Sequence, residues 1–501
     1  MLEKPTILFV SLIPRDYSPY LAKSYGMQRT FDMLPHKYAI LTLVAWLREN
    51  NCGGDYVWVY GTDENDLAAI DDAISNLRPH ALGFSLVTEE MIQHYRLIGL
   101  LKERHPDIPV VAGGPHVSAL PEHTLKNFPK IDFVCVGEGE RTLTELLFRI
   151  AAGHGDSGSQ GRWRTDVLKQ VRGIGFRDDD GAVIVNPGRE QIRDINILPD
   201  PAYDLIYDEN AQTDERSAFP LVCSYGCYFF CTFCSVDHGN YRSINPMKLA
   251  ARIAWAQQEY GVEYFAIRDS FWPPSRKWLD EFCNEIERRG LKIKFHFQTR
   301  AGALDLERLL RLKKIGAQAI AIGVEAGDPE ILKSIKKSIT VDGARRAIKA
   351  INEAGIFSIA FFIFGNKGET RASIQKSIDL ATELNASIAF FHVLIALPGA
   401  EAFEAVPDAE KDWWMGKSPL PSICDMSVDD MSRLATDSFL RYPLRWSYLS
   451  QHVIGGGLSP EFREIAKRLY SVHLRKFILG NMERVPFFRW VISNLKKLRG
   501  G

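Results

Sequence analysis

The chain has 501 residues, 46% of them hydrophobic and 25% charged, which is typical of a folded protein with a large core. Its 61 Lys and Arg residues balance 62 Asp and Glu residues, so there is no overall basic charge that would favour a nucleic-acid partner. No run of about 18 apolar residues occurs and the N-terminus lacks a signal-peptide pattern, so we expect a cytoplasmic protein.

The first 150 residues alternate short apolar runs with helix-like stretches. This alternation predicts an α/β domain with a doubly wound, Rossmann-like parallel sheet that has helices on both faces. The repeating runs lie at residues 7–10, 39–47, 56–60, 81–85, 110–114 and 133–137. Two glycine turns, at 113–116 and 137–140, follow expected strands, where ligands of this fold bind. Neither turn is a GxGxxG fingerprint, and simple backbone geometry is the alternative explanation.

A second alternation follows a connector. Residues 151–205 are rich in Gly, Ser and Asp, with a hairpin-like turn at 178–181, and they form the expected connector. Residues 206–400 predict a partial barrel of six strand–helix units, with functional residues at the carboxyl ends of its strands. The expected strands are 219–222, 264–268, 294–297, 319–323, 358–363 and 388–394. Residues 401–501 are expected to form a mainly helical region that covers the substrate.

The end of the chain is basic. From residue 473 to 501 there are seven Lys or Arg residues against the single acidic residue Glu483, and apolar residues recur there at helical spacing. Two interpretations stay open: a terminal helix that packs on the barrel, or a membrane-surface helix that brings the enzyme to a lipid-like substrate.

Four of the eight cysteines lie within residues 223–234. This clustering favours a reduced compartment and a metal site over a disulfide framework. Cys227, Cys231 and Cys234 have CxxxCxxC spacing, so each can bind one iron of a 4Fe-4S cube and leave the fourth iron open to a substrate or cofactor. Cys223 could supply a fourth thiolate and close that site, although its place at a strand end favours a non-ligand.

The segment 224–234 resembles the cluster loop of radical S-adenosylmethionine (SAM) enzymes. The earlier segments 111–116 and 136–140 resemble the cobalamin-binding domain of the superfamily's cobalamin-dependent branch, which includes the class B methyltransferases. The resemblance covers about residues 5–400. It implies three cofactors, namely a 4Fe-4S cluster, SAM and cobalamin, and an external electron donor of the flavodoxin or ferredoxin type.

The resemblance also implies a mechanism. SAM bound to the open iron is cleaved to a 5′-deoxyadenosyl radical, which removes a hydrogen atom from an unactivated carbon of the substrate. In the methylating members, methylcobalamin then gives its methyl group to that carbon. The protein positions the cofactors and excludes water and oxygen.

Site residues follow from the matching motifs. Phe233 corresponds to an aromatic residue near the adenine of SAM, and Glu325 to a carboxylate that binds the ribose hydroxyls. Asp269 and Arg300 are candidates for the amino and carboxylate ends of SAM. The alternative for Phe233 is simple packing, and for Glu325 it is a surface position. Asp269 and Arg300 could instead form a structural ion pair. The residues expected along cobalamin are Ser85, Gly113, Gly114, His116, Gly137 and Glu138.

The chain departs from the family pattern in three places. The first strand is not followed by Asp-x-His-x-x-Gly, so we expect no histidine ligand below the cobalt, and His36 is expected to be a cap or surface residue. Tyr225 stands where the branch often has Arg. Asn366 and Lys367 replace a Leu-Pro pair at a position we expect to be structural.

The leading hypothesis is methylation of an unactivated carbon in a small-molecule or lipid-like substrate. The alternatives are an oxidative cyclase or ring-rearranging enzyme of tetrapyrrole or natural-product biosynthesis, and a non-catalytic cobalamin or iron-sulfur sensor. The catalytic residue, the substrate and the oligomeric state do not follow from the sequence.

Overall fold

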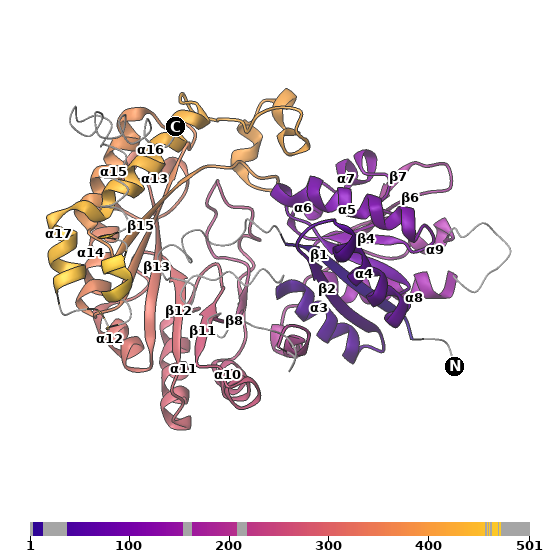
Figure 1. Ribbon diagram of the computed structural model, residues 1–501, viewed down its shortest axis with the longest axis horizontal. Coiled ribbons are helices and arrows are strands. Elements are labelled where there is room, and N and C mark those ends of the chain that lie inside the picture. Colours follow the sequence, from indigo (N-terminus) through magenta and orange to yellow (C-terminus); the bar gives the residue numbers. More distant parts are fainter. Residues whose placement is uncertain are drawn as a thin grey trace, which may run out of the picture.

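The computed structural model describes residues 4–13, 38–153, 163–207 and 218–455, and near the C-terminus 458, 460, 463–468 and 470–471. Two lobes, each built on one large sheet, lie side by side in Figure 1. The basic tail (473–501) and His36 lie outside the described residues. No helix in the described ranges is long and apolar enough to cross a membrane.

The N-terminal sheet has seven strands in the order β2-β1-β3-β4-β5-β6-β7. The strands are β1 (Thr6–Leu12), β2 (Gly53–Val59), β3 (Ala81–Ser85), β4 (Val110–Gly113), β5 (Phe133–Cys135), β6 (Ile174–Arg177) and β7 (Val183–Val185). Strands β1 to β5 are parallel, whereas β6 and β7 form an antiparallel hairpin at one edge. The hairpin turn is the one predicted at 178–181, so the expected connector contributes two strands to this sheet.

Helices cover both faces of the N-terminal sheet. Because successive side chains of a strand point to opposite faces, Ile7 and Phe9 belong to one core cluster and Leu8 and Val10 to another. The helices are α3 (Tyr38–Glu49), α4 (Glu64–Leu77), α5 (Met91–Arg104), α6 (Pro115–Ala119), α7 (Pro121–Asn127), α8 (Gly139–Gly153) and α9 (Thr165–Leu168). The predicted doubly wound fold is confirmed.

The second sheet is a parallel, open barrel of six strands in the order β15-β14-β13-β12-β11-β8. The strands are β8 (Phe219–Leu221), β11 (Tyr264–Ile267), β12 (Lys294–Thr299), β13 (Ala317–Glu325), β14 (Phe357–Phe364) and β15 (Ile388–Val393). Its helices are α10 (Pro246–Tyr260), α11 (Arg276–Arg289), α12 (Leu306–Lys314), α13 (Pro329–Ser334), α14 (Val341–Glu353) and α15 (Arg371–Leu384). The predicted partial barrel is confirmed, with β8 and β15 as its two edges.

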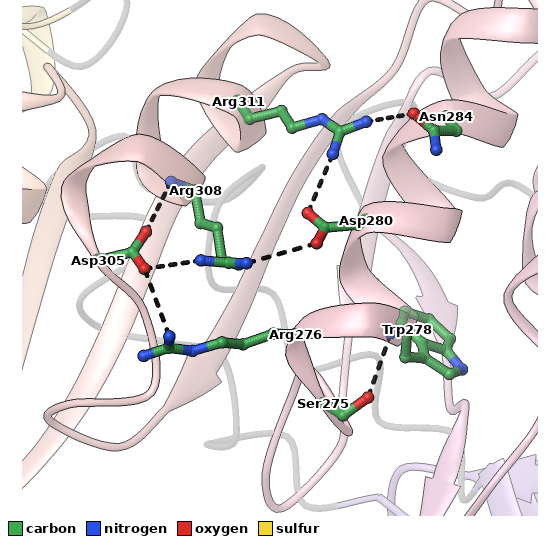
Figure 2. Close-up of polar contacts among 8 residues, drawn as sticks. All are labelled: Ser275, Arg276, Trp278, Asp280, Asn284, Asp305, Arg308 and Arg311. Atoms are coloured by element: carbon green, nitrogen blue, oxygen red, sulfur yellow. Dashed lines mark hydrogen bonds and ion pairs between the residues drawn. The ribbon is translucent and has the colours of Figure 1, made fainter.

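A charge network joins two barrel helices on the outside (Figure 2). Asp305 caps α12 by accepting a hydrogen bond from the Arg308 backbone N–H. Asp280 on α11 accepts hydrogen bonds from Arg308 and Arg311 of α12, at 3.4 and 3.0 Å. Such partly exposed pairs each contribute about 1 kcal/mol or less, so the network serves mainly to set the spacing of α11 and α12.

After β15 the chain returns to the N-terminal lobe. We call residues 396–416 the return segment, which Figure 1 shows in orange running from the barrel across the top of the molecule. Four of its side chains are buried in the core of the N-terminal lobe: Ala396, Phe403, Val406 and Trp414. The chain then goes back to the barrel, where α16 (Val428–Arg441) packs against β15. The C-terminal region is mainly helical, as predicted.

Candidate functional site

The three cysteines lie in the loop between β9 (Ser224–Tyr225) and β10 (Arg242–Ser243), just beyond the end of β8. Backbone hydrogen bonds fix this loop, because Cys227 N–H donates to Asp237 O and Gly239 N–H donates to Cys227 O. Gly226 has a φ of 75°, and a Cβ atom there would lie 2.5 Å from Asn240 O. Only glycine therefore fits the turn that starts the cluster loop.

The three thiols form one group. Burial, helped by the nearby Cys231 and Cys227, raises the pKa of Cys234. In the described parts of the chain no three His, Cys, Asp or Glu side chains converge on a point that could hold a single metal ion. A 4Fe-4S cube does not require convergence, because each thiolate binds a different iron. Three clustered thiols without a fourth in the loop are the ligand set that such a cube needs.

Cys223 is placed as a structural residue. Its thiol is fully buried and donates a hydrogen bond to Asp269 Oδ2 at 2.9 Å, while its backbone N–H donates to Asp269 Oδ1. Burial and the adjacent Asp269 raise the pKa of Cys223, which keeps the thiol neutral. A neutral thiol with a carboxylate partner is a poor iron ligand, so the geometry favours the three-cysteine interpretation.

Asp269, predicted to contact SAM, supports the base of the cluster loop. Ser224 Oγ donates to Asp269 Oδ2 at 2.7 Å, in addition to the two hydrogen bonds from Cys223. Burial raises the pKa of Asp269 to about 6. The carboxyl group therefore already has three donors, and its contact with SAM stays a prediction.

Arg300 lies against the cluster loop. Its Nη1 is 3.6 Å from Cys231 Sγ, and its guanidinium carbon is 3.5 Å from the centre of the Phe229 ring. Its Nη2 is buried and has no hydrogen-bond partner among the residues that the structure describes. A buried guanidinium N–H is costly without an acceptor, so a carboxylate such as that of SAM fits this position.

Lys337, which no sequence motif indicates, links Glu325 to Phe233. Glu325 ends β13 with a φ of 64°, and Lys337 Nζ is 2.5 Å from its Oε1. The same ammonium group lies 5.6 Å from the centre of the Phe233 ring. Lys337 follows α13 in a turn with no sequence motif, so no pattern signals it.

Four of the predicted cobalamin residues line the carboxyl ends of strands in the N-terminal sheet. Ser85 ends β3 and Gly113 ends β4. Gly114 has a φ of 96°, and a Cβ atom there would lie 2.7 Å from Leu86 O. Gly137 has a φ of 79° and no described atom within 4 Å of an added Cβ. The three glycines leave their part of the edge without side chains, and the open space at Gly137 lets a large flat cofactor approach the backbone closely.

His116 packs against the return segment. It is buried, its Nδ1 lies 3.0 Å from Thr88 Oγ1, and its ring meets Trp414 of the return segment edge-on at 5.3 Å. Burial lowers its pKa to about 4, so the ring is neutral. His116 connects the predicted cobalamin turn to the return segment, and its contact with cobalamin stays a prediction.

Glu138 joins the two lobes. It accepts a hydrogen bond from Ile192 N–H and forms an ion pair with Arg242 at 2.5 Å. The Arg242 guanidinium lies 5.8 Å from the centre of the Tyr225 ring. A cation is therefore present beside Tyr225 even though the chain has no Arg at that position.

The return segment connects the cluster loop to the cobalamin edge. An added Cβ at Gly399 would be 3.4 Å from the Ala119 side chain on α6 and 3.8 Å from the Ser235 side chain, which directly follows Cys234. Ala402 N–H donates to Thr232 O within the cluster loop. The return segment therefore forms a junction between α6, which follows the first glycine turn, and the cluster loop.

Glu140, in the second glycine turn, is expected to make the unfolding free energy depend on pH. It is buried at the start of α8, and burial raises its pKa to about 7 from an ordinary value of 4.5. A carboxyl group with a raised pKa contributes stability below its unfolded pKa, and this is lost as the pH rises through its folded pKa. Relative to Glu140→Gln, the wild type should lose about 3 kcal/mol of unfolding free energy between about pH 4.5 and 7.

Urea unfolding of both proteins across that pH range measures this difference. Glu122→Gln, at an exposed position on α7, is the matched control and should stay parallel to the wild type. Parallel curves for Glu140→Gln and the wild type would show that Glu140 keeps its ordinary pKa.

Two family matches cover most of this architecture. The Radical SAM superfamily matches residues 221–381, and the B12 binding domain matches residues 27–147. An uncharacterized methyltransferase of Pyrococcus horikoshii is 28% identical over 76% of this chain and 82% of its own length. The anaerobic magnesium-protoporphyrin IX monomethyl ester cyclase of Rubrivivax gelatinosus is 29% identical over 73% of this chain and 66% of its own length.

Solved structures show the same fold. TsrM of Kitasatospora setae, a radical SAM methyltransferase with cobalamin and a 4Fe-4S cluster bound, has a TM-score of 0.63 at 16% identity, over 81% of this chain and 78% of TsrM. OxsB, a cobalamin-dependent SAM radical enzyme, has a TM-score of 0.61 at 18% identity, over 99% of this chain and 71% of OxsB.

These matches confirm the predicted cofactor set, because the radical SAM domain implies the 4Fe-4S cluster and SAM, and the other domain implies cobalamin. They also confirm that the protein is an enzyme. The individual contact residues stay predictions. The chain belongs to the radical SAM superfamily, as a member that carries a B12-binding domain ahead of its radical SAM domain.

Proposed function

We propose that the protein transfers a methyl group to an unactivated carbon of a small-molecule substrate. The observation that carries the proposal is the position of Gly399 in the return segment, where an added Cβ would lie within 4 Å of both Ala119 on α6 and Ser235 beside the cluster loop. A carbon radical formed beside the cluster needs its methyl donor within a few ångströms, and two separated sites could not meet this requirement.

The chain's own residues have distinct parts in this proposal. When bound, the cluster and SAM supply a radical for hydrogen abstraction, and cobalamin supplies the methyl group. Cys227, Cys231 and Cys234 hold the cluster, and the unpartnered Nη2 of Arg300 receives the SAM carboxylate. Glu325 accepts from the ribose hydroxyls. The return segment closes the junction and excludes water from it.

A second function has a specific observation in its favour. The cyclase of Rubrivivax gelatinosus matches this chain about as well as the Pyrococcus methyltransferase does. Oxidative ring formation in a tetrapyrrole is therefore the alternative. The cytidylyl-2-hydroxyethylphosphonate methyltransferase of Streptomyces wedmorensis, 23% identical over 70% of each chain, supports methyl transfer.

The deciding experiment uses the reconstituted enzyme, a chemical reductant and SAM labelled in its methyl group. Magnesium-protoporphyrin IX monomethyl ester and cytidylyl-2-hydroxyethylphosphonate serve as trial substrates. We expect 5′-deoxyadenosine in every reduced sample and a labelled product from an accepted substrate. An unlabelled, oxidised product would replace methyl transfer by cyclisation, and absence of 5′-deoxyadenosine would argue for the non-catalytic sensor.

Three finer points belong to the same proposal. A lipid, isoprenoid or tetrapyrrole is favoured over a peptide as substrate because the tail (473–501) combines basic and apolar residues. That tail makes a peripheral membrane contact for an enzyme that is otherwise cytoplasmic, and a flavodoxin or ferredoxin supplies the electron. Sedimentation with anionic vesicles tests the tail, because equal binding by a version that ends before Val485 would show that the tail does not bind membranes.

A further inference from the structure

Lys337 and Glu325 form a buried ion pair, and neither the sequence motifs nor the related proteins assign a role to Lys337. Glu325 is 5% exposed and Lys337 is 7% exposed. Lys337 Nζ lies 2.5 Å from Glu325 Oε1, and in the described part of the chain it is the one hydrogen-bond partner of this carboxylate. A single donor leaves Oε2 with its acceptor capacity unused.

We infer that Lys337 is a positioning residue for SAM, which holds the Glu325 carboxylate in the orientation in which Oε2 accepts from the ribose hydroxyls. The inference rests on the proposed function, in which Glu325 binds the ribose. The ammonium group of Lys337 holds Oε1, so the carboxylate cannot rotate freely and Oε2 keeps one direction.

The backbone around the pair is strained in a way that favours function over simple stability. Three of the six non-glycine residues with left-handed φ in the described ranges lie here: Glu325 at 64°, Lys336 at 52° and Ser338 at 56°. Such residues cluster at ligand sites, where surrounding contacts hold them in place. The two left-handed residues on either side of Lys337 fix its backbone, so its side chain points back to the end of β13.

The absence of a side chain at Gly323 leaves the space that the ion pair occupies. An added Cβ at Gly323 would lie 2.2 Å from Glu325 Oε1 and 2.7 Å from Lys337 Nζ, so the strand leaves room for the pair by having no side chain there. Replacing a buried ion pair by apolar residues is often neutral or stabilising. The left-handed backbone and the close fit of the pair are therefore better explained by ligand binding than by stability alone.

Lys337 also touches the cluster loop. Its ammonium lies over Phe233, the neighbour of the iron ligand Cys234. Thr232 N–H donates to Ile335 O, two residues before Lys337. The turn after α13 thus holds the cluster loop and the ribose carboxylate together, so that both ends of one SAM molecule are positioned by one segment.

The test compares SAM with its 2′-deoxy analogue in equilibrium binding to the enzyme reconstituted with cluster and cobalamin, under anaerobic conditions. For Lys337→Met we expect SAM to bind about 10- to 100-fold more weakly and the preference for SAM over the 2′-deoxy analogue to disappear. Lys337→Arg keeps the charge and should recover most of both. Lys333→Met is the matched control, because Lys333 is exposed on α13 and has no part in the ion pair, and it should leave both unchanged.

Each outcome decides one point. If Lys337→Met keeps the wild-type preference, or weakens both ligands equally so that the preference survives, Lys337 is structural and the inference is overturned. If the wild type itself shows no preference for the ribose hydroxyl, the assignment of Glu325 is the part that fails. If Lys337→Met does not retain its cluster, Lys337→Gln takes its place with the same expected loss of preference.

Discussion

Cys231→Ala is expected to abolish 5′-deoxyadenosine formation, whereas Cys223→Ala should retain it. If each thiolate of the loop binds one iron, as we propose, loss of one leaves a cube without enough ligands to stay intact. Cys223 instead donates to Asp269 as a neutral thiol. Its removal should cost only about 1–2 kcal/mol of unfolding free energy, from a small buried cavity and a lost hydrogen bond.

Iron content, the visible absorption of the cluster and product formation from SAM measure this difference. Cys227→Ala and Cys234→Ala should behave as Cys231→Ala does. The contrary result, loss of the cluster in Cys223→Ala but not in one of the three loop variants, would move the ligand set to Cys223 and remove the open iron on which the proposed function depends.

Trp414→Ala is expected to lower the unfolding free energy of the protein by about 3–5 kcal/mol. The indole is buried, and it packs against Phe403, His116 and His123 at ring distances of 5.3 to 5.9 Å. Its removal leaves a cavity between the return segment and the N-terminal lobe. Retention of cobalamin should fall with it, because His116 lies in the turn next to the bare glycine edge.

Trp446→Ala is the matched control. This tryptophan is 74% exposed, so its removal should change the unfolding free energy by no more than about 0.5 kcal/mol. Denaturant unfolding of the three proteins, together with cobalamin content after gel filtration, gives both readouts. Equal stability of Trp414→Ala and Trp446→Ala would mean that the return segment does not anchor the lobe.

Strand periodicity predicted the fold well because buried parallel strands are local apolar runs. All six predicted barrel strands correspond to observed strands, and the cluster loop follows β8 as expected. The glycine turns were also predictable, since Gly114 and Gly137 have the positive φ that favours glycine.

What the sequence could not predict are the contacts that join distant segments. Lys337 reaches Glu325 through a turn that has no motif, and Glu138 pairs with Arg242 from the other lobe. His116 follows a recognisable glycine turn, yet its ring faces Trp414, about three hundred residues later in the chain. Periodicity reports which face of an element is buried, but it does not report which partner covers that face.

The return segment also sets an order for biosynthesis. The core of the N-terminal lobe includes Trp414, so that core stays incomplete until the ribosome has made more than four-fifths of the chain. The side of α5 that contacts residues 413–415 is uncovered throughout that time, whereas the strands of the barrel are synthesised consecutively and can pair as they emerge. The N-terminal lobe is made first, yet its core cannot be completed until all the barrel strands have been made.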